Sequence, residues 1–450
     1  MADGAGLEDA ETLAERIEWT RGGELVATLE ELEAVAAARP ADAGPKCLAA
    51  LLGLLARADD AGPEAAQQAC EVVSRLVAPK GDPQAGRANG AALLADPQHI
   101  VALLDLLESP ACEAYTAVVC LELVGALHLS HAEKLRSCLL GVPAGAARLL
   151  ETLADRRDAV RNAAVQLWEK LTRPEAAASR SLDELRTCCA FSDVFAKAYA
   201  VLDDEEIDDA AGYAARDCVR LVANVLAGPP AALTVFRDAS PNNGLDWVVR
   251  FLDVPPPENR PRDEPGERLE EEGPLSPALT RAHDSAAARR RGAVAALGVV
   301  RRVLSRGGSD DRAKAWNFED LRLSVLALGL ADDEGRVVDV SDDAFPAYGP
   351  GFVEDVSAER WWALNTEEAG KAPGRVEVRA AALHVLALWA SAESDIALRF
   401  GEARAPTDGD SPLALTVSLD LATRPATFGP AAEAALGVAT AAWAHEQAAV

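Results

Sequence analysis

Apolar residues recur through most of the chain at the spacing of one face of an α-helix. Between Asp158 and Pro174, five of them fall at intervals of four, three, one and three residues, which makes one wide apolar stripe. The five are Val160, Ala164, Leu167, Trp168 and Leu171. Asp158 is expected to cap the start of this helix, and Pro174 ends it because proline cannot continue the backbone hydrogen bonds. Since 148–157 carries an apolar face of its own, 148–173 is predicted to be a pair of helices.

The same pattern returns before and after this pair. Helix pairs are predicted at 46–77, 99–129 and 191–228, and further helices at 284–305, 376–392 and 431–449. Equivalent leucines at 76, 127, 171 and 226 stand 51, 44 and 55 residues apart, near the roughly 40–47 residues of armadillo and HEAT repeats. One pair cannot bury its own stripe, whereas stacked pairs share a continuous core. The sequence therefore predicts an all-α protein, an armadillo/HEAT-like right-handed α-solenoid with long loop insertions.

Two long segments interrupt the helical pattern. The first, 254–277, is rich in proline and charge, and the second, 331–374, carries glycine, proline, acidic residues and aromatics. Helix pairs of one type are predicted on both sides of each segment. We therefore interpret both as loop insertions in a single helical region that covers 1–450, and not as linkers between domains.

The charge of the chain narrows the range of partners. It has 44 basic and 72 acidic side chains and a formal net charge of −28, so its surface repels nucleic acid and anionic lipid on average and leaves basic proteins as partners. The eight cysteines are scattered without a CxxC motif and are expected to be buried, reduced thiols, as in a cytosolic protein. The acidic N-terminus does not resemble a signal peptide, and we expect no transmembrane helix.

Motifs that carry catalysis or bind cofactors are missing from the sequence. There is no GxSxG elbow, GxGxxG fingerprint or phosphate-binding Gly-Lys-Ser/Thr loop. His128 and His131 could share a helix face, but no HExxH motif or cysteine at zinc spacing accompanies them. Cys188 and Cys189 are adjacent and point in different directions on a helix. We therefore expect no catalytic residue, no cofactor and no metal site.

Arginines cluster in the predicted helix at 284–305 and form one candidate partner-binding site. Arg290 and Arg301 are eleven residues apart, about three helical turns, and so share a face. Arg291 and Arg302 do likewise. Two interpretations stay open. The arginines could pair with an acidic loop such as 268–273, or they could form a docking face for an acidic partner or for anionic lipid headgroups.

Two adjacent tryptophans form the other candidate site. Trp361 and Trp362 lie in the second long insertion. They either pack back onto the helices or serve as an exposed aromatic anchor for a partner.

The segment 139–173, LLGVPAGAARLLETLADRRDAVRNAAVQLWEKLTR, resembles the head of the Uso-type vesicle-tethering factors, also called general vesicular transport factor or transcytosis-associated protein. That family has a Pro-x-Gly turn followed by a run close to RLxxxLADxRxxIRNxxVxLLxxLTR. The matching positions are Pro143, Gly145, Arg148, Leu149, Leu153, Ala154, Asp155, Arg161, Asn162, Leu171, Thr172 and Arg173. The likeness covers 100–254 and, less closely, 284–450.

The resemblance implies an armadillo-like head that binds proteins and is not an enzyme. Such heads act in transport from the endoplasmic reticulum to the Golgi and within the Golgi. They are peripheral on the cytosolic face of Golgi and vesicle membranes and work with Rab-type GTPases, golgins and SNARE proteins. A coiled coil follows the head in that family and dimerises it. No sustained heptads occur here, so we expect either a fragment or a shortened relative, and a homodimer stays open.

Two other functions remain as alternatives. The first is a different armadillo/HEAT adaptor, for nuclear transport or complex assembly. Nuclear-import receptors of this type carry repeated Trp-Asn pairs, and this chain has one, Trp316-Asn317. The second is a helical enzyme, which no motif in the sequence supports.

Overall fold

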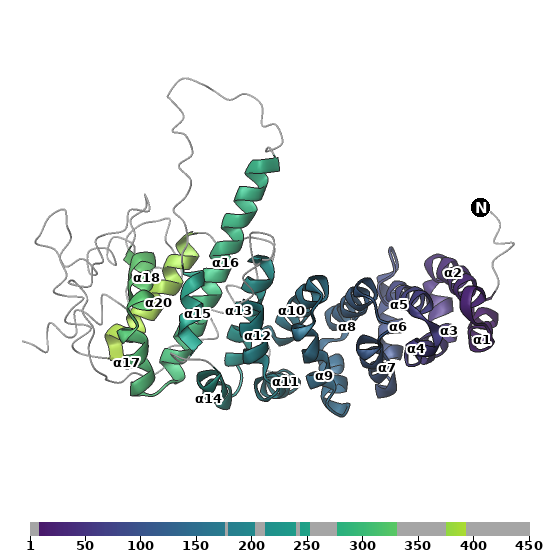
Figure 1. Ribbon diagram of the computed structural model, residues 1–450, viewed down its shortest axis with the longest axis horizontal. Helices are drawn as coiled ribbons and strands as arrows, with labels where there is room; N and C mark the ends of the chain where they lie inside the picture. The colour runs from purple at the N-terminus through teal and green to yellow at the C-terminus, as the bar shows by residue number, and fades with distance from the viewer. Residues whose placement is uncertain are drawn as a thin grey trace, which may run out of the picture. The chain divides into compact units, whose positions relative to one another are not determined.

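The computed structural model describes residues 9–175, 179–202, 212–239, 244–252, 277–330 and 375–392. Within these ranges the regular structure is helical and no strand occurs (Figure 1). The predicted all-α class is therefore confirmed for the described residues. Their contacts divide the chain into two compact units, Met1–Val201 and Leu202–Val450, and a single continuous helical region stays a prediction. The predicted insertion 331–374 and the predicted helix 431–449 lie outside the described residues.

The helices of the first unit follow one another with short connections. They are α1 (Ala10–Trp19), α2 (Gly22–Ala38), α3 (Pro40–Leu55), α4 (Ala58–Ala61), α5 (Pro63–Val77), α6 (Pro83–Leu93), α7 (Pro97–Glu108), α8 (Ala114–Gly141), α9 (Gly145–Glu151), the 3-10 helix η1 (Thr152–Ala154), α10 (Asp158–Thr172) and α11 (Arg180–Phe191). The helix α12 (Val194–Leu202) comes next. The predicted pairs at 46–77, 99–129 and 148–173 are all present.

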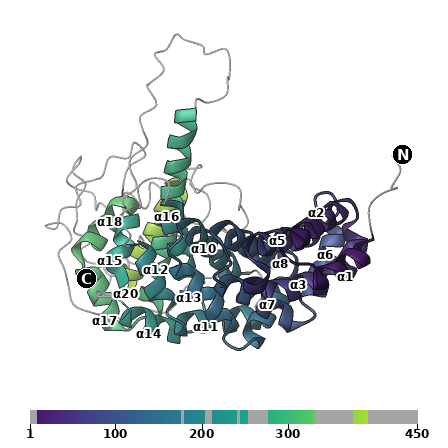
Figure 2. The same cartoon turned by 45° about the vertical axis from the view of Figure 1, so that its right-hand side comes forward.

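These helices form two layers. In one layer α2, α5, α8 and α10 lie side by side, and in the other α1, α3, α7, α9 and α11 follow one another (Figure 2). Both layers contribute buried side chains to a shared core. Leu29, Val73, Leu123 and Leu167 come from successive helices of the first layer, and all are buried. Stacked pairs thus cover the apolar stripes that a single pair would leave in water.

Proline and its neighbours set where several of these helices begin. The first residues of α3, α5, α6 and α7 are Pro40, Pro63, Pro83 and Pro97. Proline suits the first position because its fixed φ matches the helix. The backbone N–H of the first residue of a helix has no partner within the helix, so a proline there loses no hydrogen bond. Gly62 precedes α5 with φ +87°, in the left-handed region that favours glycine. Gly62-Pro63 is thus the turn that leads into the second helix of the predicted pair at 46–77.

The predicted cap of α10 is wrong. Asp158 is the first residue of the helix, Arg157 holds the cap position, and no side chain caps the helix there. Asp158 instead accepts a hydrogen bond from Arg161 at 2.7 Å. Its carboxylate still favours the helix, because a negative charge in the first turn complements the helix dipole.

The longest helix of this unit, α8, contains a kink. At His131 the backbone leaves helical geometry, with φ −146° and ψ 45°, and the ring Nε2 lies 2.9 Å from the carbonyl oxygen of Arg87. By length and composition alone α8 could cross a membrane, as could α6 and α7 together despite a 91° bend. A core helix passes the same test, and α8 packs against α5, α7 and α10.

The second unit contains α13 (Gly212–Leu226), α14 (Ala231–Asp238), α15 (Leu245–Val248), the 3-10 helix η3 (Val249–Phe251), α16 (Pro277–Arg306), α17 (Ser309–Asn317), α18 (Glu319–Leu330) and α20 (Arg375–Ala392). Here α16 packs against α13 and α20, and α18 also contacts α20. Trp316 and Trp389 meet edge to face, with ring centroids 5.1 Å apart. Pro277, predicted as the end of the first insertion, begins α16, and 254–276 lie outside the described residues.

Candidate partner-binding surface

Two of the four arginines predicted as a partner-binding site are buried. Arg301 and Arg302 lie in the part of α16 packed among its neighbours, and each is only 7% exposed. An exposed docking stripe that includes these two residues is therefore wrong, because a buried guanidinium cannot meet a partner. The side chains of Arg290 and Arg291 are outside the described set, and partner binding there stays a prediction.

Trp361 and Trp362 lie within 331–374, outside the described residues. Their predicted role as an anchor for a partner therefore stays a prediction.

The cysteines confirm the expectation of buried thiols. All eight fall within the described residues, none forms a disulfide, and six of them are buried. Burial raises the pKa of Cys47 to about 12 and that of Cys112 to about 11. Because the thiolate is the reactive form, such thiols are inert at neutral pH.

Metal-binding groups are missing from the part of the chain that the structure describes. No group of three or more His, Cys, Asp or Glu side chains there could hold an ion. His131 is used at the kink of α8. The pKa of His128 is lowered by burial and by the positive charge of Arg136.

The residues that carry the family resemblance hold the helical pairs together. Arg148 in α9 donates to Glu108 at 2.6 and 2.8 Å and to Asp105 at 2.7 Å, and both acceptors lie in α7. Gly145, the first residue of α9, has no room for a side chain, since an added Cβ would lie 2.6 Å from the carbonyl oxygen of Leu139. This part of the motif fixes how α9 sits against α7 and α8.

The LAD part of the motif, 153–155, helps to connect the start of α10 to the segment before α8. Asp155 accepts three hydrogen bonds from Arg157, at 2.8 Å from its backbone and at 2.9 and 2.7 Å from its guanidinium. The same guanidinium donates to the carbonyl oxygen of Cys112 at 2.6 Å. The start of α10 is thereby tied to the segment that leads into α8. These residues of the motif therefore hold neighbouring helices in place.

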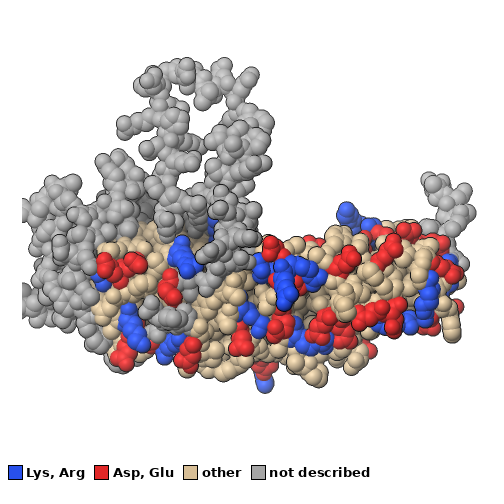
Figure 3. All heavy atoms as spheres, in the orientation of Figure 1, with Lys and Arg blue, Asp and Glu red and all other residues tan. Residues whose placement is uncertain are grey.

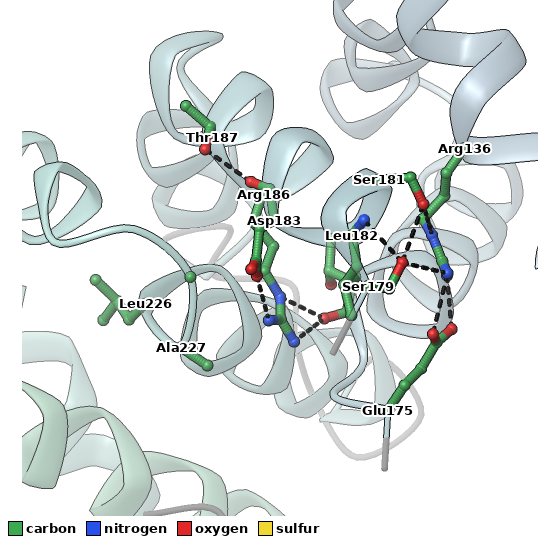
Figure 4. A network of polar contacts seen from close by, with 12 residues as sticks. Arg136, Glu175, Ser179, Ser181, Leu182, Asp183, Arg186, Thr187, Leu226 and Ala227 are labelled. Atoms are coloured by element: carbon green, nitrogen blue, oxygen red, sulfur yellow. Dashed lines mark hydrogen bonds and ion pairs between the residues drawn. The ribbon is translucent and has the colours of Figure 1, made fainter. Parts of the chain in front are cut away.

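A buried polar network fixes the far half of α8 to the start of α11 (Figure 4). Arg136 is 1% exposed and donates to both carboxylate oxygens of Glu175, at 2.7 and 3.1 Å. It also donates to the hydroxyls of Ser181 and Ser179, at 3.3 and 3.4 Å. Arg186 donates twice to the carbonyl oxygen of Thr172, at 3.1 and 2.9 Å, and so holds the end of α10. These bonds keep α8, α10 and α11 in fixed positions.

One face of α8 is not covered by neighbouring helices, and no motif or spacing in the sequence marks it. Tyr115 is 56% exposed and Leu129 is 83% exposed. Between them Val118 and Ala126 are half-buried and Glu122 is exposed. We call these five residues the α8 stripe. Their successive spacings of 3, 4, 4 and 3 residues place them on one side of the helix, away from the buried residues that form the core.

Carboxylates surround the tyrosine end of the α8 stripe. The negative charge of Glu71 in α5 raises the pKa of Tyr115, with further contributions from burial, a hydrogen bond to Glu71 and the charge of Glu122. Gln67 donates to Glu71 at 3.0 Å. Figure 3 shows acidic side chains in patches over the described surface, with basic side chains between them.

Comparisons with known proteins give the fold. No protein-family model and no curated protein sequence matches the chain significantly. The crystal structure of Uso1-1 superposes on 96% of this chain with a TM-score of 0.65 and 15% identity, and that of Uso1-2 on 97% with a TM-score of 0.63 and 15% identity. The chain has the α-solenoid fold of a Uso1 head. In each case it spans 61% of the length of the solved structure.

The comparisons support the resemblance found in the sequence. At 15% identity the likeness to Uso1 shows the fold alone, and that fold is the armadillo-like one that the motif implied. The predicted Uso-type head is thus confirmed as a fold, together with the predicted α-solenoid.

Proposed function

We propose that this chain is the head of a vesicle-tethering factor that acts in transport from the endoplasmic reticulum to the Golgi and within the Golgi. One observation carries the proposal: the fold of Uso1 extends over 96% of the chain. The sequence motif of the same family lies inside that fold, in the helical pairs α9–α10, where its residues hold neighbouring helices.

The proposed mechanism is binding without catalysis. Stacked helical pairs give a rigid surface, and exposed side chains on that surface select the partner. The chain is recruited to the cytosolic face of Golgi and vesicle membranes through a membrane-bound protein, of the kind that the family resemblance implies: a Rab-type GTPase, a golgin or a SNARE protein. Its net charge of −28 favours recruitment by protein over direct binding to anionic lipid.

The test is to express the tagged chain in cells, image it and fractionate the membranes. We expect punctate signal that overlaps Golgi and vesicle markers, and release of the chain from membranes by alkaline carbonate. Retention after carbonate treatment would instead indicate that α8 spans the bilayer. A signal that is wholly soluble or mitochondrial would contradict the proposal, and a nuclear signal would favour an armadillo adaptor of nuclear transport.

A further inference from the structure

The α8 stripe has the dimensions of a helix-docking site. From Tyr115 to Leu129 it spans fifteen residues, and the fourteen steps between them measure about 21 Å at 1.5 Å each. A helix of about 15 residues covers that length with four turns. Tyr115 and Leu129 stand at its two ends as exposed anchors, and the half-buried Val118 and Ala126 lie between them.

The position of the stripe is fixed by the fold. Gly125 and Ala126 belong to the helical stretch packed on α10, and a Cβ added to Gly125 would touch Leu167 at 3.8 Å. The guanidinium of Arg157 holds the segment before Tyr115 through the carbonyl oxygen of Cys112. The anchors are therefore presented on a rigid helix, so little conformational entropy is lost when a partner binds.

The helices that flank the stripe on its α5 side are strongly acidic. The helices α2 and α5 and the first half of α8 hold one basic residue, Arg75, and it is paired with Glu33. The same three helices hold seven glutamates, which are Glu24, Glu30, Glu31, Glu33, Glu64, Glu71 and Glu122. Two of these, Glu71 and Glu122, are close enough to Tyr115 to raise its pKa. An occupant of the Tyr115 end of the stripe therefore meets a negative field on its α5 side.

We propose that the α8 stripe binds a basic amphipathic helix of a partner protein. This inference rests on the proposed function, since it names the chemistry of a partner for the same protein-binding head. Apolar side chains at intervals of three and four residues on the partner helix lie against Tyr115, Val118, Ala126 and Leu129. Lysines or arginines beside them face Glu71 and Glu122.

The same charges argue against the other occupants. Anionic lipid headgroups would be repelled by the glutamates of α2 and α5. Two copies of the stripe packed face to face and antiparallel would bring Glu122, at the centre of the stripe, against Glu122 of the other copy. Exposed ion pairs contribute little affinity each. The apolar anchors therefore supply most of the affinity, and the glutamates supply association rate and selectivity.

Three designed peptides of about 15 residues test the proposal. The first has leucines on one helical face and lysines on both sides of it. The second has the same composition in an order that abolishes the apolar face, and the third carries glutamates in place of the lysines. Binding of each to the purified full chain is measured by isothermal titration calorimetry at low and at high salt.

Three variants accompany the wild type. Tyr115→Ser/Leu129→Ser removes the anchors, and Glu71→Gln/Glu122→Gln removes charge at equal size. Phe191→Ser is the matched control, because Phe191 is 62% exposed but ends α11, in the other layer. Circular dichroism confirms that each variant keeps its helical content.

We expect the wild type to bind the first peptide at least tenfold more tightly than the other two. The anchor variant loses at least tenfold in affinity, the Gln variant loses several-fold together with most of the salt dependence, and Phe191→Ser stays within twofold of the wild type. Equal binding of the scrambled peptide, or unchanged binding by the anchor variant, overturns the proposal. Concentration-dependent dimerisation that only the anchor variant loses, with no peptide bound, assigns the stripe to a second copy and also overturns it.

The cellular test of the proposed function separates the two ideas. If the wild-type chain binds the peptide but never reaches Golgi membranes, the tether function fails and the stripe is retained as a binding site. If the wild type reaches the membranes and the peptide is not bound, the head function holds and the chemistry proposed for the stripe is wrong.

Discussion

Substitutions in the buried pair of Arg136 and Glu175 should destabilise the chain by an amount that depends on which partner is removed. Arg136 is almost fully buried, whereas Glu175 is 37% exposed. Glu175→Ala leaves a buried guanidinium without its counter-charge, and Arg136→Met leaves a carboxylate that water can solvate. The glutamate substitution should therefore destabilise the first unit more than the arginine substitution does.

The size of the effect follows from the contacts. Removing one partner of a fully buried ion pair costs about 3–5 kcal/mol, and the exposure of Glu175 lets water replace part of it, so about 2–3 kcal/mol is expected for Glu175→Ala. In Arg136→Met an unbranched apolar side chain replaces the buried stem. The hydroxyls of Ser179 and Ser181, 3.1 Å apart, can still bond to each other. About 1 kcal/mol is expected there.

Amide hydrogen exchange measures this locally, because the opening free energy of the α11 amides reports on the junction between α8 and α11. The combined substitution serves as control and closes a double-mutant cycle. Glu175→Ala should lower the opening free energy of the α11 amides more than Arg136→Met does. If Arg136→Met lowers the α11 opening energy as much as Glu175→Ala does, burial of the guanidinium is not what makes the pair important.

Three further predictions concern the helical pairs and their buried groups. Gly145→Ala places a Cβ 2.6 Å from the carbonyl oxygen of Leu139 and should lower the free energy of unfolding, measured in urea, by about 2 kcal/mol. The control Gly141→Ala meets nothing within 4 Å and should leave that free energy unchanged. Equal effects of the two substitutions would contradict the packing argument. Cys47, whose pKa is about 12, should not react with Ellman's reagent at pH 8 until the chain unfolds, and rapid labelling of the folded chain would refute this. Burial, with a smaller contribution from Arg301, lowers the pKa of His384 from 6.5 to about 4. Between these pH values the unfolded chain binds more protons than the folded chain. The free energy of unfolding therefore falls by up to about 3 kcal/mol as pH drops from 6.5 to 4. His384→Leu should flatten this pH dependence, and an unchanged dependence would show that other groups cause it.

Local sequence signals predicted the helices well, because their causes are local. The start of α5 at Gly62-Pro63 and the end of α10 before Pro174 are properties of one or two residues, and the predicted helix end before Pro174 is confirmed. The predicted cap of α10 is wrong because Arg157, whose backbone and guanidinium both donate to Asp155, takes the cap position. The helix therefore begins one residue earlier than a cap at Asp158 requires.

Exposure depends on neighbours that are distant in the sequence, and there the prediction failed. The spacings of Arg290 from Arg301 and of Arg291 from Arg302 predicted shared faces, and one interpretation was a docking face. Because α16 packs against α13 and α20, Arg301 and Arg302 are instead buried. The converse happened in α8. Tyr115 and Leu129 stand in a helix so rich in apolar residues that periodicity alone assigns them to the core, and only the arrangement of α5 and α10 shows that this face is uncovered.

The two failures have one physical origin, and it bears on where partner selection resides in this fold. The motif that signalled the family consists of residues that hold helices in place, such as Gly145, Arg148 and Asp155. Such residues are constrained by packing, and so they identify the scaffold. The two anchors of the α8 stripe, Tyr115 and Leu129, are mostly exposed, so packing constrains their identity less and it can follow a partner. A solenoid with the same motif and different side chains at 115 and 129 should therefore keep its fold and bind a different helix.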